Sequence, residues 1–282
     1  MFKHSHVLLV GLGFLLMLTA CNITVTPDPD NTPDVGSTVF AAIRWGDPSR
    51  AMDVVFFADE GYGNLSNATN LQNFLNDVSD AIDTGFYQNN AVVNNLGRFN
   101  FWYSTKSGAD VEKHPDDDVI CPSVTWPTIT DSAFAEMRVI IHRETDVRDC
   151  GGGGTATAQA GDSNWWIIVH EAGHAMFGLP DEYCCDGGYW NVPPVLYNSS
   201  NACNNDAANA AWRNCVQMSS GATTVNWWRS QGTNIDLMRN AGPTVWEIGP
   251  AGWVIMRQVL DALPGSPPNE PDVFAPTNWN WN

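Results

Sequence analysis

Two histidines and a glutamate share a short stretch of the chain, His170-Glu171-Ala172-Gly173-His174. On a helix, residues four positions apart lie on one face, so both imidazoles should lie side by side with Glu171 next to them. Two neutral imidazoles from one helix are typical Zn²⁺ ligands, and a carboxylate beside them is typical of a general base. The spacing therefore predicts zinc-dependent hydrolysis, with His170 and His174 as ligands and Glu171 as the catalytic base.

A catalytic zinc site needs a third protein ligand and one position left open for water. Gly178 lies three residues before Asp181, and a glycine at a helix end lets the chain turn back toward the metal. Asp181 is therefore predicted as the third ligand, with Glu182 as its close alternative. In a further alternative, both carboxylates only cap the helix or pair with an arginine.

With these ligands, zinc would lower the pKa of a water in the open position to ~7. Glu171 would take a proton from this water as it attacks a peptide carbonyl, and would later give the proton to the leaving amine. Tyr183 and Tyr189 are candidate donors to the oxyanion.

The helix that carries the motif has clear start and stop signals. Asp162 or Ser163 provides an N-cap, and Gly178 followed by Pro180 ends the helix. Its back should be buried, because apolar residues recur there at helical spacing: Trp165, Ile168, Val169, Ala172, and Ala175 or Met176.

Short apolar runs before this helix predict strands over 53–59, 99–103 and 137–142. Apolar residues at helical spacing predict a helix over 70–82, capped by Asn67 or Thr69. Strands alternating with a helix predict an α/β fold. Beyond Tyr183 the chain is richer in loops, with helices expected over 207–216 and 249–263.

The N-terminus predicts export and a lipid anchor. Residues 1–20 have a Lys3-containing start and a short apolar run, and Leu18-Thr19-Ala20-Cys21 resembles a bacterial lipobox. The alternative is an ordinary cleaved signal. Residues 21–38 are rich in Pro, Asp and Thr and predict a flexible tether, 39–268 form the main domain, and 269–282 form a loose tail.

Cysteine usage supports an oxidising compartment. Setting Cys21 aside leaves six of the seven cysteines, an even number that favours disulfides. A second zinc site is the alternative, but no C-x-x-C pair is present in the sequence. Adjacent Cys184 and Cys185 are expected to bind two separate segments. The remaining members of the set are Cys121, Cys150, Cys203 and Cys215.

The net charge of −18, with only 13 Lys and Arg, argues against nucleic-acid binding. The expected partners are a protein or glycoprotein substrate and, through lipid on Cys21, a membrane. We expect the chain to act as a monomer. Some of the 13 tryptophans could stack on the sugar rings of a glycoprotein.

The segment HEAGHAMFGLPDEY, residues 170–183, is similar to the active-site signature of bacterial IgA-peptidase-type zinc metallopeptidases, relatives of the metzincins. Weaker similarities, including DVVFFADEGYG, FNFWYS and MRVIIH, extend over 53–240. The resemblance implies a zincin fold, in which a twisted mixed sheet and an active-site helix precede a smaller, disulfide-held C-terminal subdomain. Gly178 and Asp181 each come one residue later than in the usual metzincin spacing.

The same resemblance implies further roles. Met238 matches the Met-turn position beneath the metal, with Met218 as the alternative. The glycine run 151–154 would lead into a rim strand along which an extended peptide lies, although a plain loop is also possible.

The function expected from the sequence is that of an exported, lipid-anchored zinc metalloendopeptidase of the bacterial cell envelope or outer surface. One alternative is a zinc-containing surface binding module without catalysis, such as an adhesin or glycan binder. Another is a zinc amidase that acts on cell-wall peptides.

Overall fold

The computed structural model describes the central part of the chain, in segments 38–44, 51–115, 120–128, 132–161, 165–184, 188–207, 215–230, 236–239, 242 and 247–263. The expected signal segment, the lipid-bearing Cys21, nearly all of the tether and the tail lie outside these residues. The expected helix caps Asp162 and Ser163 also lie outside them, as does Cys185.

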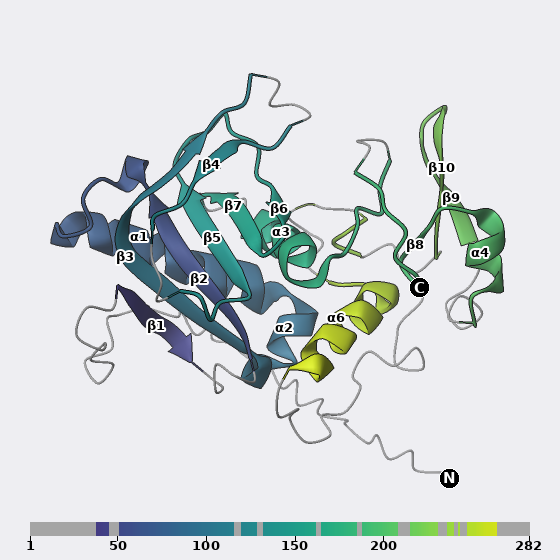
Figure 1. Cartoon of the computed structure of the whole chain (residues 1–282), viewed down its shortest axis with the longest axis horizontal. Coiled ribbons are helices and arrows are strands. Elements are labelled where there is room, and N and C mark those ends of the chain that lie inside the picture. Colours follow the sequence, from purple (N-terminus) through teal and green to yellow (C-terminus); the bar gives the residue numbers. More distant parts are fainter. Residues whose placement is uncertain are drawn as a thin grey trace, which may run out of the picture.

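The described strands form a seven-stranded mixed sheet in the order β1-β3-β2-β5-β7-β6, with β4 paired to β3 (Figure 1). Strands β3, β2, β5 and β7 run parallel, whereas β1, β4 and β6 are antiparallel to their neighbours. Their bounds are β1 Val39–Arg44, β2 Met52–Asp59, β3 Phe99–Glu112, β4 Ser123–Thr125, β5 Met137–His142, β6 Gly151–Gly152 and β7 Thr155–Gln159.

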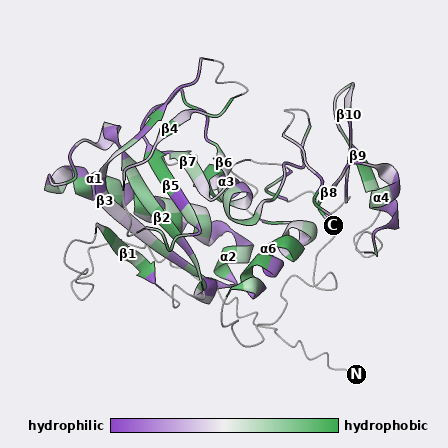
Figure 2. Ribbon diagram, in the orientation of Figure 1, coloured by the Kyte–Doolittle hydropathy of each residue, from purple (hydrophilic) through white to green (hydrophobic). Residues whose placement is uncertain are grey.

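The central strands have hydrophobic side chains on both faces of the sheet. Every residue of β2 is buried, and successive side chains alternate between two cores, as the pleat of a strand requires. Val54 and Phe56 enter the core beneath the helices, while Val55 and Phe57 enter the core on the opposite face. Strands β2 and β5 are accordingly hydrophobic along most of their length (Figure 2). The predicted α/β class is confirmed.

The predicted strands are present, and one is longer than expected. Strand β3 continues from Tyr103 to Glu112 because its second half pairs with β4. This second half is mostly polar, so it contains no apolar run that would predict a longer strand.

Helices cover one face of the large sheet. Helix α1 begins after Asn67, whose side chain accepts hydrogen bonds from the backbone of Thr69 and Asn70. The helices are α1 Ala68–Asp80, α2 Asn90–Val93, α3 Trp165–Phe177 and α6 Pro250–Ala262, and short 3-10 or π turns lie at Glu60–Tyr62, Ala81–Gly85, Phe86–Gln88 and Leu96–Arg98. Residues of all four helices share one hydrophobic core with the sheet.

A smaller sheet lies beyond α3 and α6, away from the large sheet (Figure 1). Its order is β8-β10-β9. The bounds are β8 Leu196–Tyr197, β9 Cys215–Ser220 and β10 Thr223–Ser230, with α4 at Ser200–Asn205. Most of the helix expected over 207–216 falls outside the described residues, but the prediction is wrong at its end. Cys215 and Val216 belong to β9, because a hairpin at Gly221, with φ of 56°, pairs β9 with β10.

Two disulfides join described cysteines, Cys121 to Cys150 and Cys203 to Cys215. Cys184 is disulfide-bonded as well. The expectation that Cys184 and Cys185 bind two separate segments stays a prediction, because Cys185 lies outside the described residues.

Among the described residues, no helix combines the length and the apolar character needed to cross a bilayer.

Candidate metal centre

Helix α3 packs one side on the large sheet and presents two imidazoles on another. Trp165, Ile168 and Ala172 are buried in the main core, as the helical pattern predicted. His170 and His174 lie one turn apart, with their Nε2 atoms 3.2 Å from each other.

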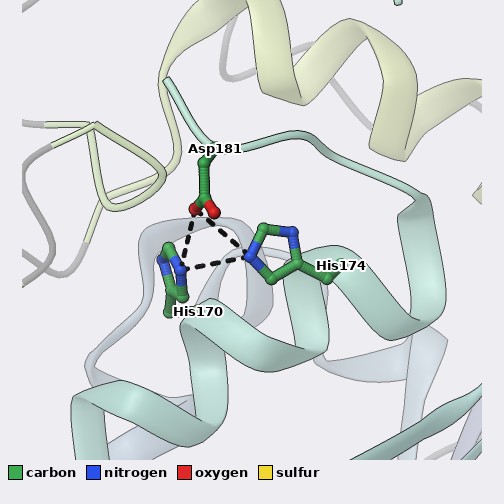
Figure 3. Close-up of side chains that lie close together, drawn as sticks. All are labelled: His170, His174 and Asp181. Atoms are coloured by element: carbon green, nitrogen blue, oxygen red, sulfur yellow. Dashed lines mark hydrogen bonds and ion pairs between the residues drawn. The ribbon is translucent and has the colours of Figure 1, made fainter. Parts of the chain in front are cut away.

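Asp181 completes a triangle with these histidines. Its Oδ1 atom lies 3.2 Å from Nε2 of His170 and 3.3 Å from Nε2 of His174. Figure 3 shows the carboxylate facing both rings from the chain segment that follows the helix. The three side chains form a group that could hold a metal ion.

The turn after α3 explains how Asp181 reaches the imidazoles. Gly178 adopts a left-handed φ of 63°, which is unfavourable for a residue with a side chain. The N–H of Gly178 donates to His174, and the N–H of Leu179 donates to Gly173, at 3.1 and 3.0 Å. The bond from Gly178 and its left-handed conformation form an αL C-cap, which sends the chain back over the helix.

Both histidines are fixed in the tautomer that a metal requires. Nδ1 of His174 lies 2.6 Å from the carbonyl oxygen of Leu179, and Nδ1 of His170 lies 3.2 Å from that of Leu237. A carbonyl oxygen can only accept, so each Nδ1 carries the proton and each Nε2 offers a lone pair. The lone pairs therefore face the centre of the triangle.

The turn Asp236–Arg239 supports the helix from below. Met238 is buried at 1% exposure, and a Cβ on Gly173 would lie 2.7 Å from its Sδ atom. Gly173 therefore lets the thioether pack directly against α3 between the two histidines. Of the two methionines considered, Met238 occupies this position, while Met218 is buried in β9.

Glu182 points away from the triangle, into a fully buried ion pair. Its Oε2 atom accepts from Nη2 of Arg239 at 2.7 Å, and the same nitrogen donates to the carbonyl of Ser230 at 3.0 Å. The backbone N–H of Glu182 donates to the carbonyl of Met238 at 2.8 Å. The adjacent carboxylates thus have separate roles, since Asp181 faces the imidazoles and Glu182 holds the supporting turn.

Asp236 belongs to the same buried network. Burial and the nearby carboxylate of Glu182 raise the pKa of Asp236 well above its ordinary value. Its Oδ1 atom accepts from the N–H of Met238 at 3.1 Å. Asp236 therefore stabilises the turn through this hydrogen bond.

Glu171 lies beside the triangle without belonging to it. Its side chain is 8% exposed, and burial raises its pKa to about 7, against the opposing effect of the two histidines. Gly151, in the outermost described strand β6, packs so closely on α3 that a Cβ would overlap the carbonyl of Glu171. A carboxyl group with a pKa near neutrality is suited to accept and return a proton.

The charges of the triangle favour its ionised carboxylate. Burial opposes ionisation of Asp181, but hydrogen bonds from His170 and His174 outweigh it and lower the pKa of Asp181 well below its ordinary value. Burial also opposes protonation of His174, but Asp181 outweighs it and raises the pKa of His174. The negative charge of Asp181 therefore favours binding of a cation between the three side chains.

Aromatic side chains lie next to both histidines of the triangle. The ring of Trp190 is 43% exposed and lies 6.4 Å from that of His174. The ring of Tyr183 lies 6.3 Å from that of His170. The hydroxyl of Tyr189 donates to the carbonyl of Tyr183 at 3.0 Å, so of the two candidate oxyanion donors it is Tyr183 whose ring lies next to the imidazoles.

Several contributors to the site were missed from the sequence. The carbonyls of Leu179 and Leu237 are backbone groups and have no signature in residue type. Close packing at Gly173 did have a signal, since an isolated glycine inside a helix often marks a close contact. Nε2 of buried His142 lies 2.9 Å from Oδ1 of Asp149, just before β6, and this pair was also not anticipated.

A comparison of the sequence with protein-family models and with curated proteins finds no significant match.

Proposed function

We propose that the chain is a zinc metalloendopeptidase, with Zn²⁺ held by His170, His174 and Asp181. The observation that carries this proposal is the triangle of ligand atoms, whose edges measure 3.2, 3.2 and 3.3 Å. Tetrahedral zinc with bonds of about 2.0–2.1 Å needs ligand atoms roughly 3.3 Å apart. Two nitrogens and one oxygen also form a donor set that zinc commonly takes.

Three protein ligands leave one position for water, which distinguishes a catalytic zinc site from a structural one. When bound, zinc would act as a Lewis acid and lower the pKa of a coordinated water to ~7. The carboxylate of Glu171 would accept a proton from the attacking water and donate it to the nitrogen of the leaving amine. A zinc-containing binding module without catalysis does not need a buried carboxyl group such as that of Glu171 beside its ligands, so we favour the peptidase.

The edge of the large sheet supports a peptide substrate. The N–H of Thr157 donates to the carbonyl of Cys150 at 2.9 Å, and Gly152 is paired with Thr155. Because hydrogen-bonded pairs alternate along an antiparallel ladder, the N–H and C=O of Gly151 point away from β7. An extended peptide could pair with these groups directly above Glu171.

A zincin fold is part of this proposal. Its support is the combination of a motif helix beneath the sheet, an antiparallel outer strand and a methionine-containing turn under the histidines. This arrangement agrees with the resemblance of residues 170–183 to IgA-peptidase-type enzymes. The substrate class, proteins or glycoproteins of the cell exterior, follows from the predicted export.

Cleavage profiling tests this function. The purified full chain is incubated with a proteome-derived peptide library in the presence of zinc, after treatment with a chelator, and after zinc is restored. We expect cleavage with zinc, its loss on chelation, and its return with the metal. Cleavage that persists in the chelated protein at the original rate would contradict a metal-dependent mechanism.

The predicted lipid anchor has its own test. Cys21→Ser should move the protein from the membrane fraction to the soluble exported fraction, because the acyl chains on Cys21 are the proposed anchor. Fractionation followed by immunoblotting measures this shift, and mass spectrometry of the wild-type N-terminus should show acyl chains on Cys21. Wild-type amounts of Cys21→Ser in the membrane fraction would refute the anchor.

A further inference from the structure

A pocket of about 270 Å³ opens next to β6 on the face of the sheet opposite α3. It is lined by Pro122, Val124, Trp126, two threonines of β7 and the disulfide Cys121–Cys150. Val124 and Trp126 pack against the core on this second face. Ala156 and Ala158 belong to the core under the helices, so Thr155 and Thr157, which alternate with them along β7, face the pocket.

The lining of this pocket favours an apolar occupant. Each residue that lines it is uncharged. Its threonine hydroxyls are already engaged, since Thr157 accepts from the N–H of Cys150 and Thr155 donates to the carbonyl of Gly152, each at 3.0 Å. The indole of Trp126 is held from another element, with the guanidinium of Arg138 4.8 Å from its centroid. A charged occupant would therefore lose hydration without meeting an opposite charge among the lining residues.

The pocket and the candidate metal centre share one residue. Gly151 lines the pocket, and the same residue packs against the carbonyl of Glu171. Side chains of a strand alternate between the two faces of a sheet. A peptide paired with the outward groups of Gly151 would thus direct every second side chain toward this pocket.

We propose that the pocket is a specificity subsite that takes one apolar side chain of an extended peptide substrate. This inference rests on the proposed peptidase function and names one preference of that activity. The Cys121–Cys150 disulfide forms one wall of the subsite, because it ties the segment before β4 to the residue preceding β6.

The test uses the zinc-loaded full chain and peptides that vary at one position at a time. We expect one position on one side of the scissile bond to favour large apolar residues over Asp, by about 10-fold to 100-fold in kcat/KM. Val124→Trp should fill the pocket and remove most of this preference, while peptides with Gly at that position are cleaved at the wild-type rate. The zinc content should be unchanged.

A second pair of variants keeps the test independent of that single substitution. The double variant Cys121→Ser/Cys150→Ser should also weaken the preference, whereas Cys203→Ser/Cys215→Ser, which opens a disulfide in the small sheet, should leave it intact. Cleavage whose preferences survive both pocket variants would overturn the subsite alone. A wild-type protein that cleaves no peptide would overturn the proposed function and the subsite with it.

Discussion

Glu171→Gln is expected to lower kcat/KM for peptide hydrolysis by about 10²-fold to 10⁴-fold and to retain one zinc ion per chain. The loss follows from removal of the general base, whose contribution is typically of this size. The metal should stay because the triangle of ligand atoms is complete without Glu171. Peptide turnover and metal analysis on the same sample measure both effects. Activity near that of the wild type would assign the base to another residue.

The free energy of unfolding of metal-free Glu171→Gln, compared with that of the metal-free wild type, provides the control for folding. The pKa of Glu171 is raised to about 7 in the folded chain by burial, from an ordinary value of 4.5. Because the folded chain favours the protonated form, Glu171 contributes fully to the free energy of unfolding below pH 4.5. This contribution is lost as the pH rises toward 7. Glutamine stays neutral throughout, so the stability of the variant relative to the wild type should increase over this range. A flat difference between pH 4.5 and 7 would argue against the buried position of Glu171.

Asp181→Ala is expected to reduce zinc affinity by on the order of 100-fold or more. Loss of a group that only hydrogen-bonds to a metal ligand typically lowers metal affinity 10-fold to 100-fold, and Asp181 lies in the triangle itself. Zinc titration with a competing chelator measures the change. Because the side chain is small, the variant should retain its fold, which circular dichroism can verify.

Glu182 is the matched comparison for Asp181. Its ion pair with Arg239 is buried, with side-chain exposures of 0% and 4%. Glu182→Ala should therefore lower the free energy of unfolding by about 3–5 kcal/mol, since it removes the carboxylate that balances the charge of a buried guanidinium. Below its unfolding temperature, this variant should still bind zinc more tightly than Asp181→Ala. The reverse order of affinities would make Glu182 the ligand.

The local parts of the fold could be predicted from the sequence. The apolar runs of β2 and β5 fixed their bounds to within a residue, because a strand buried on both faces has few polar positions. The spacing of His170 and His174 and the glycine at 178 likewise determine a helix face and the turn that follows it. Each of these inferences depends on neighbours within one or two turns of the chain.

Long-range choices could not be predicted in this way. Whether Asp181 or Glu182 turns to the imidazoles depends on Arg239, which lies 57 residues from Glu182 in the sequence. Cys215 and Val216 adopt a strand because β10 is available as a partner. The acceptors that orient the histidines are carbonyls, which every residue possesses, so no pattern of side chains reveals them.

The three proposed ligands lie within twelve consecutive residues, whereas the turn that orients His170 comes 67 residues later. An unfolded chain therefore keeps its ligands at a high effective concentration and can bind zinc weakly before the C-terminal part is in place. Any such binding subtracts from the stabilisation that the metal gives to the native state. Zinc should thus raise the unfolding temperature by less than its affinity for the native protein implies. The stabilisation by zinc that remains comes from the late docking of Asp236–Arg239.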